Sequence, residues 1–457
     1  MNESTKTKKA LRGSLFALFL CIVLLIGTTF AWFTDTASTG VNKIQSGRLD
    51  VGLEMKDNDG KWVNAEGKTL QFKVNKTIPA EGTQILWEPG CTYELPELRV
   101  VNKGNLALKY KIQITGIQGD AELNDVIDWT YGVSGAGGEA VASLDTERHL
   151  AAKTGEDDVF DTLKIKGHMQ ESAGNEYQDK SIDGVSITVI ATQDTVENDS
   201  FGNTYDANAA YPVVAKDQNE VNDIIKNATD KKATIAIPAN KTITLDNGIA
   251  NERDKSRDIT FVGDGTQTVD VITNAISAEG GQLNYQRGSS FTFENLNIQA
   301  GEGSFDGIVC NELTYKNCTI KGKLTLYGKA TFINCTFENT MADQYSIWTW
   351  GGTDVTFKGC TFNTNGKAIL LYGRATAENP TNLVVDNCNF NDRKNGTAGK
   401  AAVEVGNDYN ATYTLTINNA TVKGFADGKN TGSKLWANKN SMDAAHLTVT
   451  IDGEKIQ

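Results

Sequence analysis

Asparagines and cysteines that recur at fixed places in a repeated phrase are the first residues that could do chemistry. The windows LTYKNCTI (313–320) and ATFINCTF (330–337) each hold an Asn followed by a Cys, and they lie 17 residues apart. Thiols brought side by side could form disulfides or contribute to a metal site. The chain has no CxxC, HExxH or CxxC…HxxxH spacing, so the sequence predicts no metal cage.

The phrase occurs six times, at successive spacings of 22, 17, 25, 28 and 32 residues. Such repetition is typical of a solenoid in which loop lengths vary while the strands keep their place. Position 5 of the windows forms a corner ladder: Asn295, Asn317, Asn334, Gly359, Asn387 and Asn419. Position 6 forms an internal stack: Leu296, Cys318, Cys335, Cys360, Cys388 and Ala420.

The residue types at these two positions predict a sharp bend with a small side chain packed inside it. Asn and Gly accept a left-handed backbone at low cost, so position 5 can turn the chain between two strands. Leu and Ala fill the same place as Cys at position 6, which favours packing over disulfide formation.

A third short strand accompanies each pair of strands, in GIVCN (307–311), KLTLYG (323–328), SIWTWGG (346–352), KAILLYG (367–373) and AAVEVG (401–406). Three strands per coil resemble a right-handed parallel β-helix of the pectin-lyase-like type. The segment QNEVNDIIKNATD (218–230) places its apolar residues on one helical face and is predicted to cap the first coil.

Many β-helices of this type cleave acidic polysaccharides, so a polysaccharide lyase or hydrolase is one hypothesis. Such chemistry needs carboxylates that hold Ca²⁺ beside a basic residue, or a group of acids. On the third strand the only outward carboxylate is Glu404. No catalytic residue is assigned from the sequence. No cofactor is predicted either, and no motif indicates Ca²⁺, although the acidic composition is compatible with it.

Three aromatic residues suggest a different use of the third strand. Tyr327, Trp350 and Tyr372 each precede a Gly, so they are expected to stack on one face of three successive coils. On the outside they would form a platform for sugar rings, and on the inside a core stack. The opposite face of these strands is apolar as well, so the alternation of residue types does not show whether the three aromatic side chains point inward or outward. We prefer the inward or partly inward position.

The first half of the chain alternates with the period of strands. The expected strands are LDVGLEM (49–55), LQFKVNK (70–76), ELRVVNKG (97–104), LALKYKIQITGI (106–117) and VSITVIATQ (185–193). Short turns between alternating segments predict an antiparallel sandwich. The less periodic stretch 132–181 is expected to form long surface excursions with one short helix.

Several stretches of this half resemble the TasA/camelysin family. They are GTTFAWFTDT (27–36), KIQSGRLDVGLE (43–54), WEPGCTYELPELRVVNKGNLALKYKI (87–112) and ITVIATQDT (187–195). The resemblance covers roughly residues 9–205, and Cys91 departs from it. It implies a jelly-roll-like sandwich in a secreted Gram-positive protein, and export through a SipW-type signal peptidase. It also implies assembly into fibres, with a donor strand from Trp32 to about Lys43 that includes Phe33 and Val41.

Camelysin-type members have been classed as metallopeptidases, which is a further alternative. The chain has only three histidines, His149, His168 and His446, and none has a second histidine four residues away as a helical metal site would need. We interpret each as a solvated surface residue.

The N-terminus predicts export. A basic segment precedes the apolar run LFALFLCIVLLI (15–26), and cleavage is expected between Ala31 and Trp32. An uncleaved anchor is the alternative. The formal net charge of -13 argues against nucleic acid as a partner.

The predicted domains are therefore a signal peptide (1–31), a sandwich (32–196), a linker (197–212) and a β-helix (213–457). The chain is expected to be an extracellular cell-surface or biofilm-matrix protein of a Gram-positive bacterium. Its first domain would assemble with further copies or other matrix proteins, and its β-helix would act as an adhesin or bind cell-surface or host glycans.

Overall fold

The computed structural model describes residues 49–80, 83, 85–133, 140–142, 146–153, 155–194, 211–228, 232–245, 256–271, 282–301, 307–341, 343–373, 379–406 and 411–457. In this part of the chain no helix is long and apolar enough to cross a membrane. The predicted leader with its Ala31–Trp32 bond, the donor strand with Phe33 and Val41, and most of the predicted linker lie outside the described residues.

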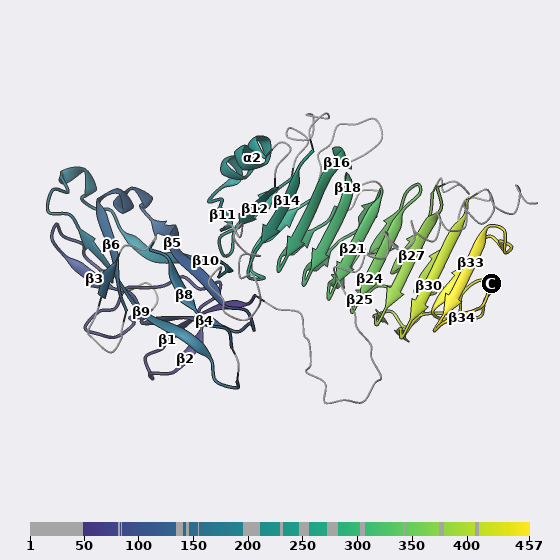
Figure 1. Ribbon diagram of the computed structural model, residues 1–457, viewed down its shortest axis with the longest axis horizontal. Helices are drawn as coiled ribbons and strands as arrows, with labels where there is room; N and C mark the ends of the chain where they lie inside the picture. The colour runs from purple at the N-terminus through teal and green to yellow at the C-terminus, as the bar shows by residue number, and fades with distance from the viewer. Residues whose placement is uncertain are drawn as a thin grey trace, which may run out of the picture. The chain divides into compact units, whose positions relative to one another are not determined.

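Antiparallel strands make up the first half (Figure 1). One sheet has the order β2-β1-β4-β9-β6-β7, with β3 also pairing with β9. Its strands are β1 (Val51–Lys56), β2 (Trp62–Asn64), β3 (Thr92–Glu94), β4 (Leu98–Asn102), β6 (Ile127–Val133), β7 (Ala140–Ala142) and β9 (Val159–Met169). A second sheet contains β10 (Ile182–Gln193), β5 (Leu108–Gly119) and β8 (Arg148–Leu150), in that order. Two 3₁₀ turns, η2 (Ala121–Val126) and η3 (Asn175–Tyr177), complete this half.

The two antiparallel sheets share one apolar core. Leu98 and Leu163 from the first sheet lie in the same buried cluster as Tyr110 and Ile112 from the second. Burying one face of each sheet is the main stabilising contribution available to short strands of this kind. The two-sheet arrangement agrees with the all-β prediction, while the jelly-roll-like topology stays a prediction.

Two expectations for the first half are wrong. Residues 70–76 form no strand, because Asn75 and Lys76 adopt left-handed φ angles of 50° and 70° and make a turn closed by Val74 and Thr77. The stretch 132–181 is not mainly surface excursions, because β9 crosses the first sheet and pairs with β3, β4 and β6. Its alternating Leu163, Ile165 and Met169 are buried.

Parallel coils make up the second half, and the parallel β-helix is confirmed (Figure 1). The longest sheet contains β11 (Val213–Val214), β12 (Lys232–Ala236), β14 (Asp258–Val262), β16 (Gln282–Glu294), β18 (Gly307–Lys316), β21 (Lys329–Ile333), β24 (Asp354–Lys358), β27 (Thr381–Asp386), β30 (Tyr413–Asn418), β33 (Leu447–Ile451) and β34 (Glu454–Lys455). Only the last pair, β33 and β34, is antiparallel among these described strands.

Two further parallel sheets belong to the β-helix, and in the described chain the last of them begins only at β20 (Leu324–Leu326). The second contains β13 (Thr242–Thr244), β15 (Thr268–Asp270), β17 (Asn297–Gln299), β19 (Thr319–Lys321), β22 (Thr336–Glu338), β25 (Thr361–Thr364), β28 (Asn389–Asp392) and β31 (Thr421–Lys423). The third, called here the third sheet, contains β20 (Leu324–Leu326), β23 (Ile347–Thr349), β26 (Ile369–Leu371), β29 (Val403–Val405) and β32 (Trp436–Asn438). The expected third-sheet strand 307–311 is instead the first part of β18, because it pairs with β16.

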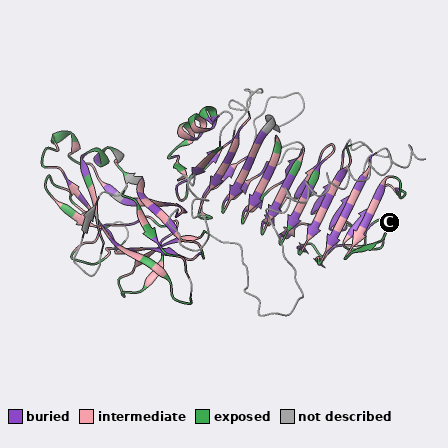
Figure 2. Cartoon of the chain, viewed as in Figure 1, coloured by how far each residue is buried: buried purple, intermediate pink, exposed green. Residues whose placement is uncertain are grey.

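Register places like residues above one another in the core. Phe293, Tyr315, Phe332 and Phe357 stack in consecutive coils, with ring centroids 4.9, 4.8 and 4.8 Å apart. Figure 2 shows the resulting alternation of buried and partly exposed residues along the strands. Close stacking of aromatic rings adds to the burial of apolar area.

The short helix α2 (Gln218–Asn227) packs on the first coils, as its apolar spacing predicts. Asp217 caps it by accepting hydrogen bonds from the backbone N–H groups of Asn219 and Glu220. Val221 and Ile225 are fully buried in the core of the β-helix. The helix therefore covers apolar core that the first coils would otherwise expose.

The buried hydroxyl of Tyr315 generates a stability prediction. Tyr315 is 0% exposed, and within the described chain its hydroxyl has no hydrogen-bond partner. Tyr315→Phe is expected to raise the free energy of unfolding by about 1 kcal/mol, because an unsatisfied buried polar group is costly. The measurement is thermal and urea denaturation. The matched control is Tyr110→Phe, which should destabilise because the Tyr110 hydroxyl donates to Asp161 at 2.9 Å. Destabilisation by both changes would contradict the prediction.

Candidate functional site

The corner ladder has the backbone geometry that turns each coil. Asn295, Asn317, Asn334, Asn387 and Asn419 have φ between 50° and 55°, and Gly359 has φ of 64°. The Asn317 side chain donates to the Asn295 side-chain oxygen at 3.2 Å, so neighbouring corners are linked. A Cβ added at Gly359 would lie 2.6 Å from the Asn334 side-chain oxygen, so a larger residue would not fit there without a shift.

The internal stack is buried behind these corners. Cys318, Cys335, Cys360 and Cys388 are at most 1% exposed, and all six cysteines of the described chain are free thiols. The first three donate to backbone carbonyls of the preceding coil at 3.3 to 3.5 Å. Hydrogen bonds within the stack, together with burial, raise the pKa of Cys335 and of Cys360 to about 12. The hydrogen bond with Cys335 instead lowers the pKa of Cys318. Because all four thiols are buried away from solvent, we interpret the ladder as packing.

The ends of the stack, Leu296 and Ala420, differ in burial. Leu296 is 1% exposed and belongs to the core, whereas Ala420 is partly buried and packs against it. Cys91 lies outside the ladder, in a turn where its N–H donates to Glu88 and its carbonyl accepts from Met169.

The aromatic row lies on the outer face of the third sheet. Leu324, Leu326 and their counterparts in later coils point into the core, so the residues that alternate with them point outward. Tyr327, Trp350 and Tyr372 are the residues immediately after β20, β23 and β26, and all three are half-buried. They are not part of the core cluster, so they do not form a core stack; being half-buried, they fit only the partly inward position.

Ring contacts join Trp350 and Tyr372 of this row with Trp348. The Trp350 and Tyr372 rings are stacked, with centroids 5.3 Å apart and planes 22° apart. Trp348, also outward and half-buried, meets Tyr372 edge-on at 5.1 Å. The Lys323 ammonium lies 4.0 Å from the centroid of the Trp348 ring. Sequence reasoning noted Trp348 but did not assign it to the site.

Glu404 occupies the next outward position in the same sheet. Register pairs Trp348 with Leu370 and Leu370 with Glu404. The carboxylate is 2% exposed, accepts from the Ala401 backbone N–H at 3.1 Å and lies 3.7 Å from the Lys400 ammonium. Burial, and then the charge of Glu404, raise the pKa of Tyr345 above its usual value. A buried carboxylate held by a lysine is a defined polar feature beside the aromatic rings.

Further lysines surround this carboxylate. Lys439 follows β32 directly and holds the place that Tyr372 holds two coils earlier. Burial, and the neighbouring charges of Lys400, Lys367 and Lys429, lower the pKa of Lys439, while Glu404 acts in the opposite direction. Sequence reasoning missed these lysines, because they come from turns of unequal length.

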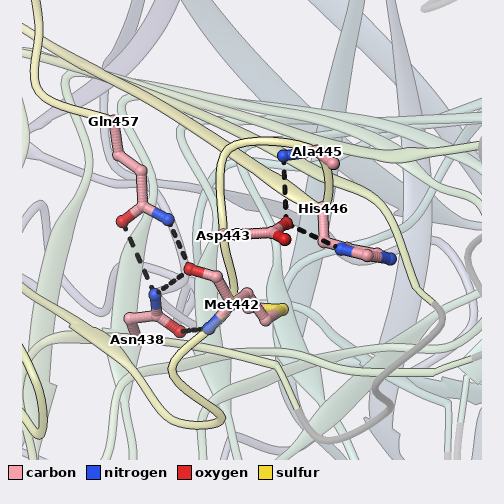
Figure 3. A network of polar contacts seen from close by, with 6 residues as sticks. All are labelled: Asn438, Met442, Asp443, Ala445, His446 and Gln457. Carbon is pink, nitrogen blue, oxygen red and sulfur yellow. Dashed lines mark hydrogen bonds and ion pairs between the residues drawn. The ribbon is translucent and has the colours of Figure 1, made fainter.

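The three histidines lie apart from this face. His149 contacts Asp194 at 2.7 Å and His168 contacts Thr92 at 2.8 Å, both in the first half. His446 contacts Asp443 at 2.9 Å in a turn of the last coil (Figure 3). In the described ranges, no three His, Cys, Asp or Glu side chains are grouped so that they could hold a metal ion.

Comparison with known proteins gives distant structural likeness only. No protein-family model matches the sequence, and no curated protein matches it. A pectin methyl esterase from rice weevil matches at a TM-score of 0.28 and 10% identity, covering 52% of this chain and 86% of its own. The catalytic domain of a GH87 alpha-1,3-glucanase, bound to nigerose, matches at a TM-score of 0.17 and 10% identity, covering 88% of this chain and 98% of its own. Scores this low carry no conclusion about activity.

The corner geometry generates a second prediction. Asn317→Ala is expected to cost about 1–2 kcal/mol of stability, because Ala has no special tolerance for a left-handed φ. Asn317→Gly should cost less, since only the link to Asn295 is lost. Thermal and urea denaturation would measure both. Asn311→Ala, at an exposed extended position of β18, is the matched control. Equal effects of Ala at 311 and 317 would show that the corner is not the cause.

Proposed function

We propose that this protein is an extracellular surface or matrix protein of a Gram-positive bacterium whose β-helix binds glycans on the outer face of the third sheet. The observation that carries the proposal is the register-aligned row of Tyr327, Trp350 and Tyr372, with Trp348 beside it. Half-buried rings held by a rigid sheet lose little entropy on binding and offer flat apolar faces.

Sugar rings suit such a surface. One face of a pyranose is lined by C–H groups, which can pack on an aromatic ring while the hydroxyls bond to polar neighbours. Glu404, Lys400 and Lys439 supply polar groups within one or two coils of the rings. The combination of apolar faces and a few fixed polar groups is typical of small-molecule and carbohydrate sites.

A polysaccharide lyase or hydrolase is the alternative function of the same face. Glu404, buried beside Lys400, is the feature that favours it, because burial and a cationic neighbour are common around catalytic acids. An enzyme would release new reducing or unsaturated ends from a bound glycan, and Glu404→Gln would abolish that release. A binding protein would retain the glycan intact. The camelysin-type metallopeptidase remains a minor alternative, which chelator-sensitive proteolysis would support.

Assembly through the first domain is the second part of the proposal. In the described chain β8 pairs with β5 only at Leu108–Tyr110, and no pairing is described for the rest of that edge. Unpaired backbone N–H and C=O groups on an edge can accept a strand from another chain. A segment beginning at Trp32 in a neighbouring copy is the proposed donor.

The glycan proposal predicts a loss of binding from single aromatic changes. Trp350→Ala and Tyr372→Ala should each weaken binding to an oligosaccharide retained on a glycan array by about fivefold, since a stacked ring contributes about 1 kcal/mol. Calorimetry with the same oligosaccharide would measure this. Phe160→Ala, which removes an aromatic residue 44% exposed in the first half, is the control and should leave binding unchanged. Binding that survives both changes, or no retained glycan at all, would overturn the proposal.

The assembly proposal predicts that a chain starting at Trp32 forms fibres and that a chain starting at Gln45 stays monomeric. Negative-stain microscopy would measure this. A synthetic peptide of residues 32–44 should bind the shorter chain by completing its sheet, whereas a scrambled peptide of the same composition should not. Monomers from the longer chain, or fibres from both, would contradict donor-strand assembly.

A further inference from the structure

Along the β-helix, the outer side of the third sheet changes from aromatic to charged residues. Its first three coils present Tyr327, Trp348, Trp350 and Tyr372, and its last two present Glu404 and Lys439. The change is abrupt, because neighbouring strands of this sheet differ by only one coil, about 4.8 Å. A ligand that lies along the face would therefore meet the half-buried rings first and Lys439 next, because Glu404 is buried beneath the surface.

Cations outnumber anions at the second end. Lys367, Lys400 and Lys429 lie close enough to Lys439 to lower its pKa, and Glu404 acts on it in the opposite direction. The Lys367 ammonium donates to the Asp343 carbonyl at 3.0 Å, and the Asp343 carboxylate is 88% exposed. The Lys367 ammonium also lies 3.5 Å from the Asp343 carboxylate, and the Lys400 ammonium lies 3.7 Å from Glu404. Four lysines therefore accompany two carboxylates here, in a chain whose formal net charge is -13.

A fixed turn holds the half-buried Lys439. The Asn438 side-chain oxygen accepts from the Met442 N–H, and its amide donates to the Met442 carbonyl, both at 2.9 Å (Figure 3). The Gln457 amide donates to the same carbonyl at 2.6 Å. Lys439 lies within this turn, and its N–H donates to the Val405 carbonyl at 2.9 Å. Its backbone is therefore held in place before any ligand arrives.

From this division, and resting on the proposed glycan function, we propose that the face selects glycans that carry one anionic group next to neutral sugar rings. The rings stack on Trp350 and Tyr372, and the anionic group lies among Lys400, Lys439 and Lys367. The shared chemistry is a carboxylate, sulfate or phosphate oxygen that accepts from ammonium groups.

The same geometry disfavours a uniformly charged polymer. The face of an aromatic ring carries negative charge density, so an anionic group placed over Trp350 or Tyr372 is repelled and loses its hydration. A polyuronate presents such a group at every sugar, whereas a chain charged at one end avoids the rings. We therefore expect a sparsely charged oligosaccharide to bind more tightly than oligogalacturonate.

The test compares oligosaccharides of one backbone, taken from the neutral glycans that the array retains. Four probes are used: the neutral form, and forms with a single terminal carboxylate, sulfate or phosphate. Oligogalacturonate is the fifth probe. At least one singly charged form should bind the full chain at least tenfold more tightly than the neutral form, and oligogalacturonate should bind less tightly than that form.

Lysine variants test whether these side chains cause the preference for the charged oligosaccharide. Lys439→Met and Lys400→Met should each remove at least fivefold of the preference for the charged form, and should weaken binding of the neutral form by a smaller factor. Lys423→Met, at an exposed position of β31 on a different sheet, removes the same charge and should have no effect. Glu404→Gln should increase affinity for the charged form, because it removes a competing negative charge. Circular dichroism and melting curves confirm that each variant is folded.

The preference for the charged probe over the neutral one should depend on pH in a defined direction. A bound anion stabilises the charged form of Lys439 and raises its pKa relative to the free protein. The preference for the charged probe should be complete below the pKa of Lys439 in the free protein, which lies below the usual value for lysine. It should fall as the pH rises through the pKa of Lys439 in the complex, to the level shown by Lys439→Met. The same titration of Lys439→Met should be flat in that window.

The outcomes separate the two proposals. If neutral glycans bind through the rings but no charged form binds more tightly, or the lysine changes have no effect, the anionic subsite is wrong and the glycan proposal stands. If oligogalacturonate binds most tightly, the selection for sparse charge is wrong. If no glycan binds in any form, both proposals fail.

Discussion

In-register hydrogen bonding between successive coils is the constraint on which the β-helix depends. A slip of one residue in any strand would move every inward side chain to the outside, so the whole register is fixed once the core is packed. The register that stacks Phe293 on Tyr315 inside the coil also stacks Trp350 on Tyr372 outside it. The hydrogen-bond register that aligns the core residues therefore also aligns the aromatic side chains of the proposed binding face.

Much of this fold could be predicted from the sequence, because its strongest signals are local. An Asn between two alternating segments marks a left-handed corner wherever it occurs, and the small residue after it marks the inside. The first half was harder. Residues 70–76 alternate like a strand, yet Asn75 and Lys76 turn the chain back on itself. Strand β9 also alternates, but its polar outward residues made the stretch look like surface.

Only part of the proposed binding face could be predicted from the sequence. A row of aromatic residues, each before a Gly, was evident from the sequence, but its direction was not. One side of these strands carries leucine and isoleucine, and the other carries tyrosine and tryptophan. Both sides are apolar, so the alternation did not show which side faces the core. Only the packing of Leu324 and Leu326 into the core settles it. Lys400 and Lys439 are 39 residues apart and come from different turns, so no sequence pattern joined them.

The ladder of buried thiols has a consequence for how the chain must fold if it is exported as we propose. Outside the cell an unfolded chain meets oxidants while Cys318, Cys335, Cys360 and Cys388 are still accessible, so coil closure competes with mispaired disulfides and sulfenic acids. The cysteines are 17, 25 and 28 residues apart in sequence, so each contact closes over a short loop. Short loops close quickly, and each completed coil hides one more sulfur. In such a solenoid, rapid formation of the coils would protect the cysteines from oxidation.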